Sequence, residues 1–381
     1  MACQRKDWKS HKESCKDAEE FKNKVIDRID GPQTTAEDVD EQIMKYRLLA
    51  QLGDRKSIFD LGVAYRTGMG VAQDEVEAVK LFKRAAELGD EDAQYNLGVA
   101  YGAGSGGVEV DRAEAVKWWR KAAEAGNIDS LYNLGRALRF GNGVKQDYTE
   151  SFKCFLAASK AGDTESHFCV GVAYNKGIGV SIDFGKAFTY YKKAADLGNA
   201  KAQHNLAVLL NEGHGCTIDK VSAFTWYRRA ADQGNIESMN NTGFCYYNGD
   251  GVAIDKFAAF KYYKRAAEAG HVDAQARLGA FYMSGTGVKV DFGESVKWLR
   301  KAAESGNALA SFNLALALKH GYGVATNLVE SCKWFKVAAE GGNAMAQWHL
   351  SMAYRSGGGV SMNDDEANRW ARLALEGGYI Q

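Results

Sequence analysis

Residues 57–90 read SIFDLGVAYRTGMGVAQDEVEAVKLFKRAAELGD, and residues 93–127 read AQYNLGVAYGAGSGGVEVDRAEAVKWWRKAAEAGN. The two stretches share a Leu-Gly pair, a glycine-rich turn, an Ala-Ala pair and a final glycine, in the same order. Seven further copies follow toward the carboxyl end. A sequence that repeats at such a period predicts a stack of like units, because each unit alone is too small to bury its apolar side.

The final glycine of each copy sets the register of the repeat. Successive final glycines are 36 residues apart, with one step of 37 that arises from an extra residue in GAGSGGV (102–108). They stand at positions 53, 89, 126, 162, 198, 234, 270, 306, 342 and 378. Because glycine takes a left-handed backbone without strain, we expect each of them to end a helix.

Each copy is predicted to contain two helices. The first carries Leu97, Gly98 and Tyr101 at helical spacing in the second copy. The second is expected to begin after a residue that can cap free backbone N–H groups. These caps are Asp74, Asp111, Asp147, Asp183, Asp219, Asp255, Asp291, Asn327 and Asn363. An aromatic residue between small residues in the second helix is typical of closely packed antiparallel helices. The predicted fold is all-α, a right-handed α-solenoid of about nine helix-turn-helix repeats.

Composition limits the location and the kind of partner. Lys and Arg together number 48, equal to Asp and Glu, so no net charge favours nucleic acid or an anionic membrane. No apolar stretch approaches the roughly 18 residues of a membrane span. The amino terminus has no signal-peptide core, and the seven cysteines are irregularly spaced, as reduced thiols would be. We therefore expect a cytoplasmic or nuclear protein.

The full pattern is A-x-x-x-L-G-x-x-Y-x-x-G-x-G-V-x-x-D-x-x-x-A-x-x-(W/F/Y)-x-x-x-A-A-x-x-G, and it resembles the Sel-1-like repeat, a relative of the tetratricopeptide repeat. The resemblance covers roughly residues 57–381. It implies a protein–protein interaction scaffold or adaptor that binds partner proteins or peptides on the concave face of the solenoid. The scattered histidines form no nucleophile–base arrangement, so we predict that the protein is not an enzyme and has no catalytic residues.

The resemblance also implies which residues line the concave face. In related repeats the residue two before the Leu and the residue one after the Gly point into the groove. The implied binding residues are Phe59, Tyr95, Tyr132, Arg136, Arg139, Phe168, His204 and Asn240. Aromatic rings beside Arg136 and Arg139 favour an acidic peptide. In the alternative interpretation the rings only pack against the adjacent repeat.

A second motif stands near the start of the chain, in CQRKDWKSHKESC (3–15). Its spacing, C-x7-H-x3-C, resembles the last third of a MYND-type zinc finger, which implies Cys3, His11 and Cys15 as metal ligands. Cys3 would belong to one zinc, and His11 and Cys15 to another, so neither site reaches four protein ligands. We expect this chain to hold no zinc by itself. Either Met1 is an internal start and the finger is completed upstream, or the motif persists as a helix without metal.

Between this motif and the solenoid we predict two further segments. Residues 16–33 carry Phe21, Val25, Ile26 and Ile29 among charges, as a short amphipathic helix and linker would. Residues 34–56 are predicted to contain an amino-terminal capping helix that ends at a final glycine. The solenoid then spans residues 57–381.

Three other functions are alternatives to the scaffold. The Gly-x-Gly-Val turns lack the Lys-Ser/Thr of a phosphate-binding loop, so a nucleotide site is not favoured. An adaptor of endoplasmic-reticulum-associated degradation would need a signal sequence. A cysteine-rich hydrolase of the β-lactamase type would need two bridged cysteines in each repeat. The cysteines of this solenoid instead fall at different repeat positions, namely Cys154, Cys169, Cys216, Cys245 and Cys332.

Overall fold

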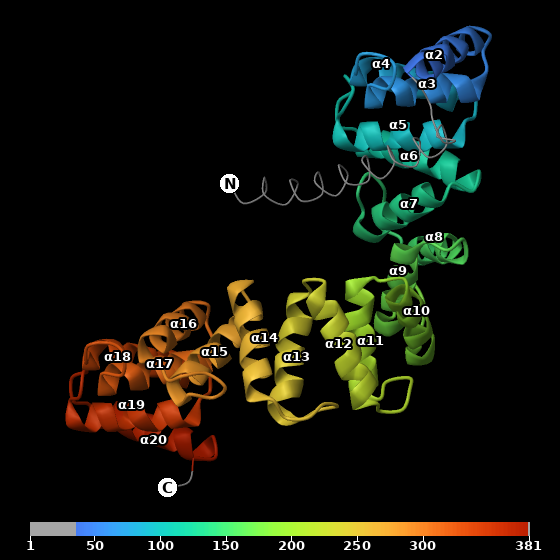
Figure 1. Cartoon of the computed structure of the whole chain (residues 1–381). Helices are drawn as coiled ribbons and strands as arrows, with labels where there is room; N and C mark the ends of the chain where they lie inside the picture. Colours follow the sequence, from blue (N-terminus) through green and yellow to red (C-terminus); the bar gives the residue numbers. More distant parts are fainter. Residues whose placement is uncertain (1–35, 380–381) are drawn as a thin grey trace. The chain divides into compact units, whose positions relative to one another are not determined.

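The structure is a computed structural model that describes residues 36–379, and the chain divides into two compact units, the first ending at Ile182 and the second beginning at Asp183. Figure 1 shows the chain as a succession of helices. Within residues 36–379 there are nineteen helices and no strand, so the predicted all-α solenoid is confirmed. In this part of the chain no helix is both long and apolar enough to cross a membrane. The predicted zinc motif (Cys3, His11 and Cys15) and the linker (16–33) lie outside the described residues.

Unit 1 ends at Ile182, and its described helices pair in chain order. Its helices are α2 (Ala36–Gln51), α3 (Arg55–Thr67), α4 (Glu75–Glu87), α5 (Glu91–Ala103), α6 (Arg112–Glu124), α7 (Ile128–Phe140), α8 (Tyr148–Lys160) and α9 (Thr164–Lys176). Helices α3 and α4, α5 and α6, and α7 and α8 form antiparallel hairpins, and each hairpin packs on the next. Helix α2 packs on α3.

Unit 2 begins at Asp183 and repeats the same arrangement. Its helices are α10 (Phe184–Asp196), α11 (Ala200–Glu212), α12 (Lys220–Asp232), α13 (Ile236–Asn248), α14 (Lys256–Glu268), α15 (Val272–Ser284), α16 (Phe292–Glu304), α17 (Ala308–His320), α18 (Leu328–Glu340), α19 (Ala344–Ser356) and α20 (Asp364–Glu376). Hairpins run from α11 with α12 to α19 with α20, and successive hairpins are in contact.

Side-chain caps start the helices where the sequence predicted them. The Asp147 carboxylate accepts a hydrogen bond from the backbone N–H of Glu150 at 2.8 Å, before α8. Asn327 caps α18 in the same way. In the first helix of each repeat the cap is the residue after the final glycine, an Asp or Asn everywhere except at His271, whose Nδ1 accepts from the backbone N–H of Ala274. Each cap satisfies a backbone donor that would otherwise lack a partner.

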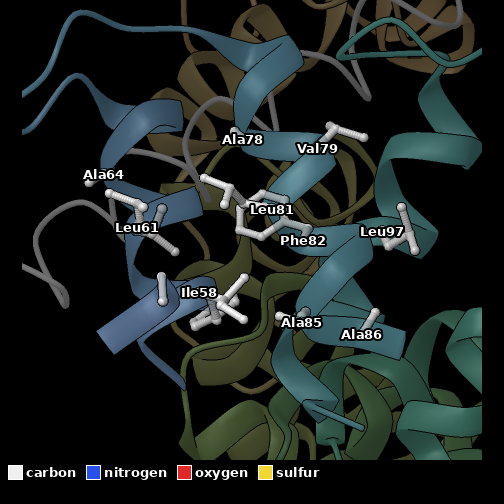
Figure 2. Close-up of a cluster of buried hydrophobic side chains, with 14 of the residues drawn as sticks. Ile58, Leu61, Ala64, Ala78, Val79, Leu81, Phe82, Ala85, Ala86 and Leu97 are labelled. Carbon is white, nitrogen blue, oxygen red and sulfur yellow. The ribbon is translucent and has the colours of Figure 1, made fainter. Parts of the chain in front are cut away.

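In several repeats the core contains an aromatic ring seated against a glycine. Phe82 of α4 is 1% exposed, and a Cβ added at Gly62 of α3 would lie 2.8 Å from its ring. The glycine of the Leu-Gly pair is therefore the space into which the ring fits. Figure 2 shows Phe82 among the side chains of the first repeat and the Leu97 of the next. Equivalent close pairs are Gly98 with Trp119, Gly135 with Phe155 and Gly243 with Tyr263.

The second glycine of the Gly-x-Gly turn joins one repeat to the preceding one. Gly251 has φ +71°, and a Cβ there would lie 1.9 Å from the carbonyl oxygen of Lys220, the first residue of α12. No residue larger than glycine fits this approach of one backbone to another. The contact recurs in both units, at Gly143 on Arg112, Gly179 on Tyr148, Gly215 on Phe184, Gly287 on Lys256, Gly323 on Phe292 and Gly359 on Leu328.

The two kinds of glycine allow a matched comparison of stability within unit 2. Gly198, a final glycine, has φ +94° and open space around it, so Gly198→Ala should cost about 1 kcal/mol through left-handed strain alone. Gly251→Ala should cost the same strain plus roughly 1–3 kcal/mol for the clash with the Lys220 carbonyl. Urea unfolding followed by circular dichroism measures both. Equal losses in the two variants would show that the turn makes no tight contact between repeats.

Candidate binding surface

The first helices of unit 1 are linked in a row. Arg66 of α3 donates from Nη1 to Oδ1 of Asn96 on α5, at 2.6 Å. Asn127, the cap of α7, donates from Nδ2 to Oδ1 of Asp92 on α5, at 3.0 Å. These polar bridges hold α3, α5 and α7 beside one another, so their exposed positions contribute to one surface of the unit.

Unit 2 has a similar row of first helices. His204 of α11 lies with Nδ1 2.8 Å from the Ser238 hydroxyl on α13. His271, the cap of α15, lies with Nε2 3.2 Å from Oε2 of Glu237 on α13. Asn307, the cap of α17, donates to Asp273 on α15 at 2.8 Å in the same way. The row therefore runs from α11 to α17.

The predicted aromatic position, fifth in the first helix, packs within its own repeat. The rings of Tyr132 and Phe155 have centroids 5.8 Å apart, and Phe155 belongs to the second helix of the same hairpin. The other pairs of this kind are Phe59 with Phe82, His204 with Tyr227 and Phe312 with Phe335. Phe59 is buried at 7% exposure, whereas Tyr132 and His204 are half-buried. Only the half-buried members leave part of their ring for a partner.

In α7 the ninth position of the first helix is more exposed than the fifth. Arg136 of α7 is exposed there, with its guanidinium carbon 5.7 Å from the centre of the Tyr132 ring. One turn on, Arg139 is half-buried and lies 5.5 Å from the Phe140 ring. Among the residues that the structure describes, no carboxylate forms an ion pair with Arg136 or Arg139, in contrast to Arg120, which pairs with Glu150. Helix α7 thus presents two cations whose charge no direct partner from the described part of the chain neutralises.

The electrostatic surroundings of this cluster are mixed. Burial raises the pKa of the Tyr132 phenol, and Arg136 opposes that rise. Burial likewise raises the pKa of the nearby Cys169 thiol to about 12, with Arg139 opposing it. Glu165, on the first turn of α9, is close enough to raise both pKa values slightly. Tyr132 therefore stays protonated at neutral pH and can donate a hydrogen bond, while Arg136 and Arg139 supply the positive charge.

The structure gathers only some of the predicted residues. Tyr132, Arg136 and Arg139 share α7, whereas Tyr95 lies half-buried on α5 and Phe168 half-buried on α9. Phe59 is buried on α3. The last two predicted residues belong to unit 2, where His204 is on α11 and Asn240 on α13. Burial lowers the pKa of His204, so its imidazole is neutral at neutral pH.

One cluster of an arginine and two aromatic rings was not predicted from the sequence. Arg277 of α15 has its guanidinium carbon 5.7 Å from the ring centres of both Phe244 on α13 and Tyr263 on α14. Phe244 is 41% exposed. The available signal was a departure from the repeat, since Arg277 holds the sixth position of its helix. Asparagine stands there in five other copies, at Asn96, Asn133, Asn205, Asn241 and Asn313.

The described cysteines are not suited to catalysis or bridging. Cys154, Cys169, Cys245 and Cys332 are buried and Cys216 is half-buried, all as free thiols. Burial raises the pKa of Cys154 and of Cys245 to about 11, so both remain protonated at neutral pH and are poor nucleophiles. Residues 36–379 also contain no group of three or more His, Cys, Asp or Glu that could hold a metal ion.

Two solved structures are similar enough to this chain to indicate its family. One is c5321, a protective antigen present in uropathogenic Escherichia coli strains displaying an SLR fold, which is 33% identical with a TM-score of 0.82. That match covers 88% of this chain and 73% of the other. The second is a Sel1 repeat protein from Oxalobacter formigenes, 30% identical with a TM-score of 0.61, covering 81% of this chain and 89% of the other. A search of curated proteins gave no match.

A family model described as the Sel1 repeat matches nine successive stretches of the chain. They are residues 55–90, 91–127, 128–163, 165–199, 200–235, 236–271, 272–307, 308–343 and 344–379. These limits follow the hairpins seen in the structure, with each stretch opening at or next to the start of a first helix. The chain therefore belongs to the Sel1 repeat family.

Proposed function

We propose that this protein is a non-enzymatic scaffold that binds segments of other proteins on the first-helix surfaces of its units. Sel1 repeat proteins are generally scaffolds for protein interactions. The free, protonated thiols support the expected cytoplasmic or nuclear location, where disulfides are rare. The surface that we assign first is the α7 cluster of Tyr132, Arg136 and Arg139.

The observation that carries this assignment is the pair of arginines that have no carboxylate partner within residues 36–379. A guanidinium offers a planar set of donors that matches a carboxylate, and such charge-assisted hydrogen bonds are stronger than neutral ones. The Tyr132 phenol adds a neutral donor on the same helix, and its half-buried ring, held against Phe155, adds a rigid apolar edge. The partner is therefore an acidic protein segment that also carries an apolar or aromatic side chain.

A substitution at the exposed Arg136 should affect binding without affecting stability, whereas a substitution at Tyr132 should affect both. Tyr132→Ala would leave a space against Phe155 and lower stability by roughly 3 kcal/mol as well as weaken binding. Arg136→Ala removes an exposed side chain and should leave the thermal unfolding curve within about 0.5 kcal/mol of the wild type. Circular dichroism melting of both variants checks this difference.

Binding can be measured on an array of short acidic peptides that each contain one aromatic residue, with charge-reversed peptides alongside. The wild-type chain should prefer the acidic set, and the Arg136→Ala, Arg139→Ala double variant should weaken that binding by about tenfold or more, the loss of one or two charged hydrogen bonds. Arg112→Ala is the matched control, because it removes an exposed charge from α6 instead. Equal binding of both peptide sets, or an equal loss in the control, would refute the assignment.

Metal binding by the amino-terminal motif also stays a prediction. Cys3, His11 and Cys15 are divided between two sites in the pattern that they resemble, so this 381-residue chain should lose any zinc on dialysis against a mild chelator. Elemental analysis of the dialysed protein, with Cys15→Ser as the control, measures the remainder. One zinc per chain that disappears in Cys15→Ser would overturn this expectation and assign a complete site.

A further inference from the structure

The ninth position of the first helix is apolar in each of the last four repeats of unit 2. These residues are Phe244, Ala280, Leu316 and Met352, on α13, α15, α17 and α19, and together they form the apolar row. Phe244 and Met352 are 41% and 44% exposed. Ala280 and Leu316 are half-buried. Among the first helices described for unit 1, the one exposed residue at this position is Arg136, so the two units offer different surfaces.

The apolar row crosses helices that lie side by side within unit 2. Side-chain bridges join α13 to α15 and α15 to α17. The rings of Phe312 on α17 and His349 on α19 have centroids 5.9 Å apart. Because members of the row are 36 residues apart, they occupy the same level of successive helices. The row therefore runs across the first helices rather than along one of them.

Two more exposed apolar side chains widen the row at its carboxyl-terminal end. Leu309 of α17 and Met345 of α19 hold the second position of their helices and are 52% and 47% exposed. Each is seven residues before the row member of its helix, which places both on the same side of that helix. In the seven earlier repeats the second position is charged, at Lys56, Asp92, Asp129, Glu165, Lys201, Glu237 and Asp273. A contiguous exposed apolar patch of this kind marks an interaction surface.

The surroundings of the apolar row are basic. Helices α17 and α19 contain no Asp or Glu, whereas each first helix from α3 to α15 contains at least one. Lys319 and Arg355 stand one turn beyond the row members of α17 and α19, and Arg277 lies beside the Phe244 ring. Within residues 36–379, neither Arg277 nor Lys319 forms an ion pair with a carboxylate, and Arg355 donates to the Asn368 amide oxygen. Three cations beside the row therefore favour an occupant that carries acidic groups.

The spacing of the first helices favours an extended occupant. Packed helices lie roughly 8–10 Å apart, which is also the separation expected between neighbouring members of the row. A polyproline II segment rises about 3.1 Å per residue with three residues per turn, so one side of it recurs about every 9.3 Å. In a β-strand, by contrast, residues three apart point to opposite sides. A polyproline II segment therefore places every third side chain on successive members of the row.

We propose that the apolar row binds an extended, proline-rich segment of a partner protein, with an apolar residue at every third position and acidic residues beside them. This inference rests on the proposed scaffold function, but its site lies on unit 2, whereas the α7 cluster lies on unit 1. The apolar residues of the segment lose contact with water against Phe244, Leu316 and Met352. The flexible methionine side chains adapt to their shape, and the prolines reduce the conformational entropy lost on binding.

Fluorescence polarisation with two synthetic peptides tests the period of three. The triplet probe contains four Leu-Pro-Pro triplets with an Asp-Asp pair at each end, and the block probe has the same composition with its leucines adjacent. The full chain should bind the triplet probe about tenfold or more tightly, because only this probe presents leucines at the spacing of the row. A triplet probe with Lys in place of Asp should bind more weakly, because it meets the three cations with like charge.

Two exposed members of the row have matched controls of the same residue type in unit 2. Met352→Asp should weaken binding of the triplet probe by about tenfold or more, whereas Met362→Asp, at a methionine 69% exposed just before α20, should leave it unchanged. Phe244→Ser should weaken binding in the same way, and Phe257→Ser, at a phenylalanine 55% exposed on α14, should not. Circular dichroism verifies that each variant is folded.

Further outcomes separate this site from the α7 cluster and from other occupants. The Arg136→Ala, Arg139→Ala double variant should bind the triplet probe as the wild type does, and loss of that binding would overturn the proposal. Equal binding of the two probes, or equal losses in a variant and its control, would also overturn it while leaving the α7 assignment intact. So would a wild-type dimer, detected by light scattering, that Met352→Asp dissociates, because a second copy would then cover the row.

Discussion

The spacing of the repeats depends on a backbone-to-backbone contact made by glycine. From Gly143 onward, the second glycine of each turn lies on the carbonyl of the residue that opens the preceding second helix, as Gly251 lies on Lys220. Main-chain atoms set this distance, so it is the same whatever side chains the two repeats carry. Where a ring of the second helix faces a glycine of the first, as Phe82 faces Gly62, it sets how closely the two helices of the hairpin approach. Together the two glycine contacts explain why the chain tolerates variation at most other positions of the repeat.

Because some positions of the repeat make the packing contacts and others do not, only the latter are free to acquire a binding function. The fifth position of the first helix is largely committed to the core, because its ring packs on the second helix of the same hairpin. The ninth position carries little of the packing where it is exposed, and it varies from Arg136 to Phe244 to Met352. Because the backbone frame is the same in each repeat, this variation gives the chain different surfaces. The surface is basic on α7, and on α13 it is apolar, where Phe244 lies beside Arg277 of α15. We expect the residues at these positions to determine which partner binds.

Much of the fold could be predicted because its constraints are local and recur at one period. The caps, such as Asp147, and the corner glycines, such as Gly198, act within a few residues, so the aligned copies revealed them. The binding surface was harder to predict from the sequence. An alignment of copies places Tyr132 and Arg136 in the repeat, but the partner of each side chain depends on which residues the neighbouring helices bring near. Asn96 accepts from Arg66 and is buried, and Arg277 lies near two rings of the preceding repeat. The boundary at Ile182 also has no signal in the spacing, since Gly162 and Gly198 keep the usual interval.

The central claim is that stability comes from contacts between neighbouring repeats rather than from one shared core. Removing residues 344–379, and then residues 308–379, tests it most directly through the urea unfolding of each shortened chain. The account predicts that the remaining repeats stay folded and that the two removals lower the unfolding free energy by similar steps. Loss of all helical signal when the last repeat alone is removed would contradict it, because a single cooperative core would then hold the chain together.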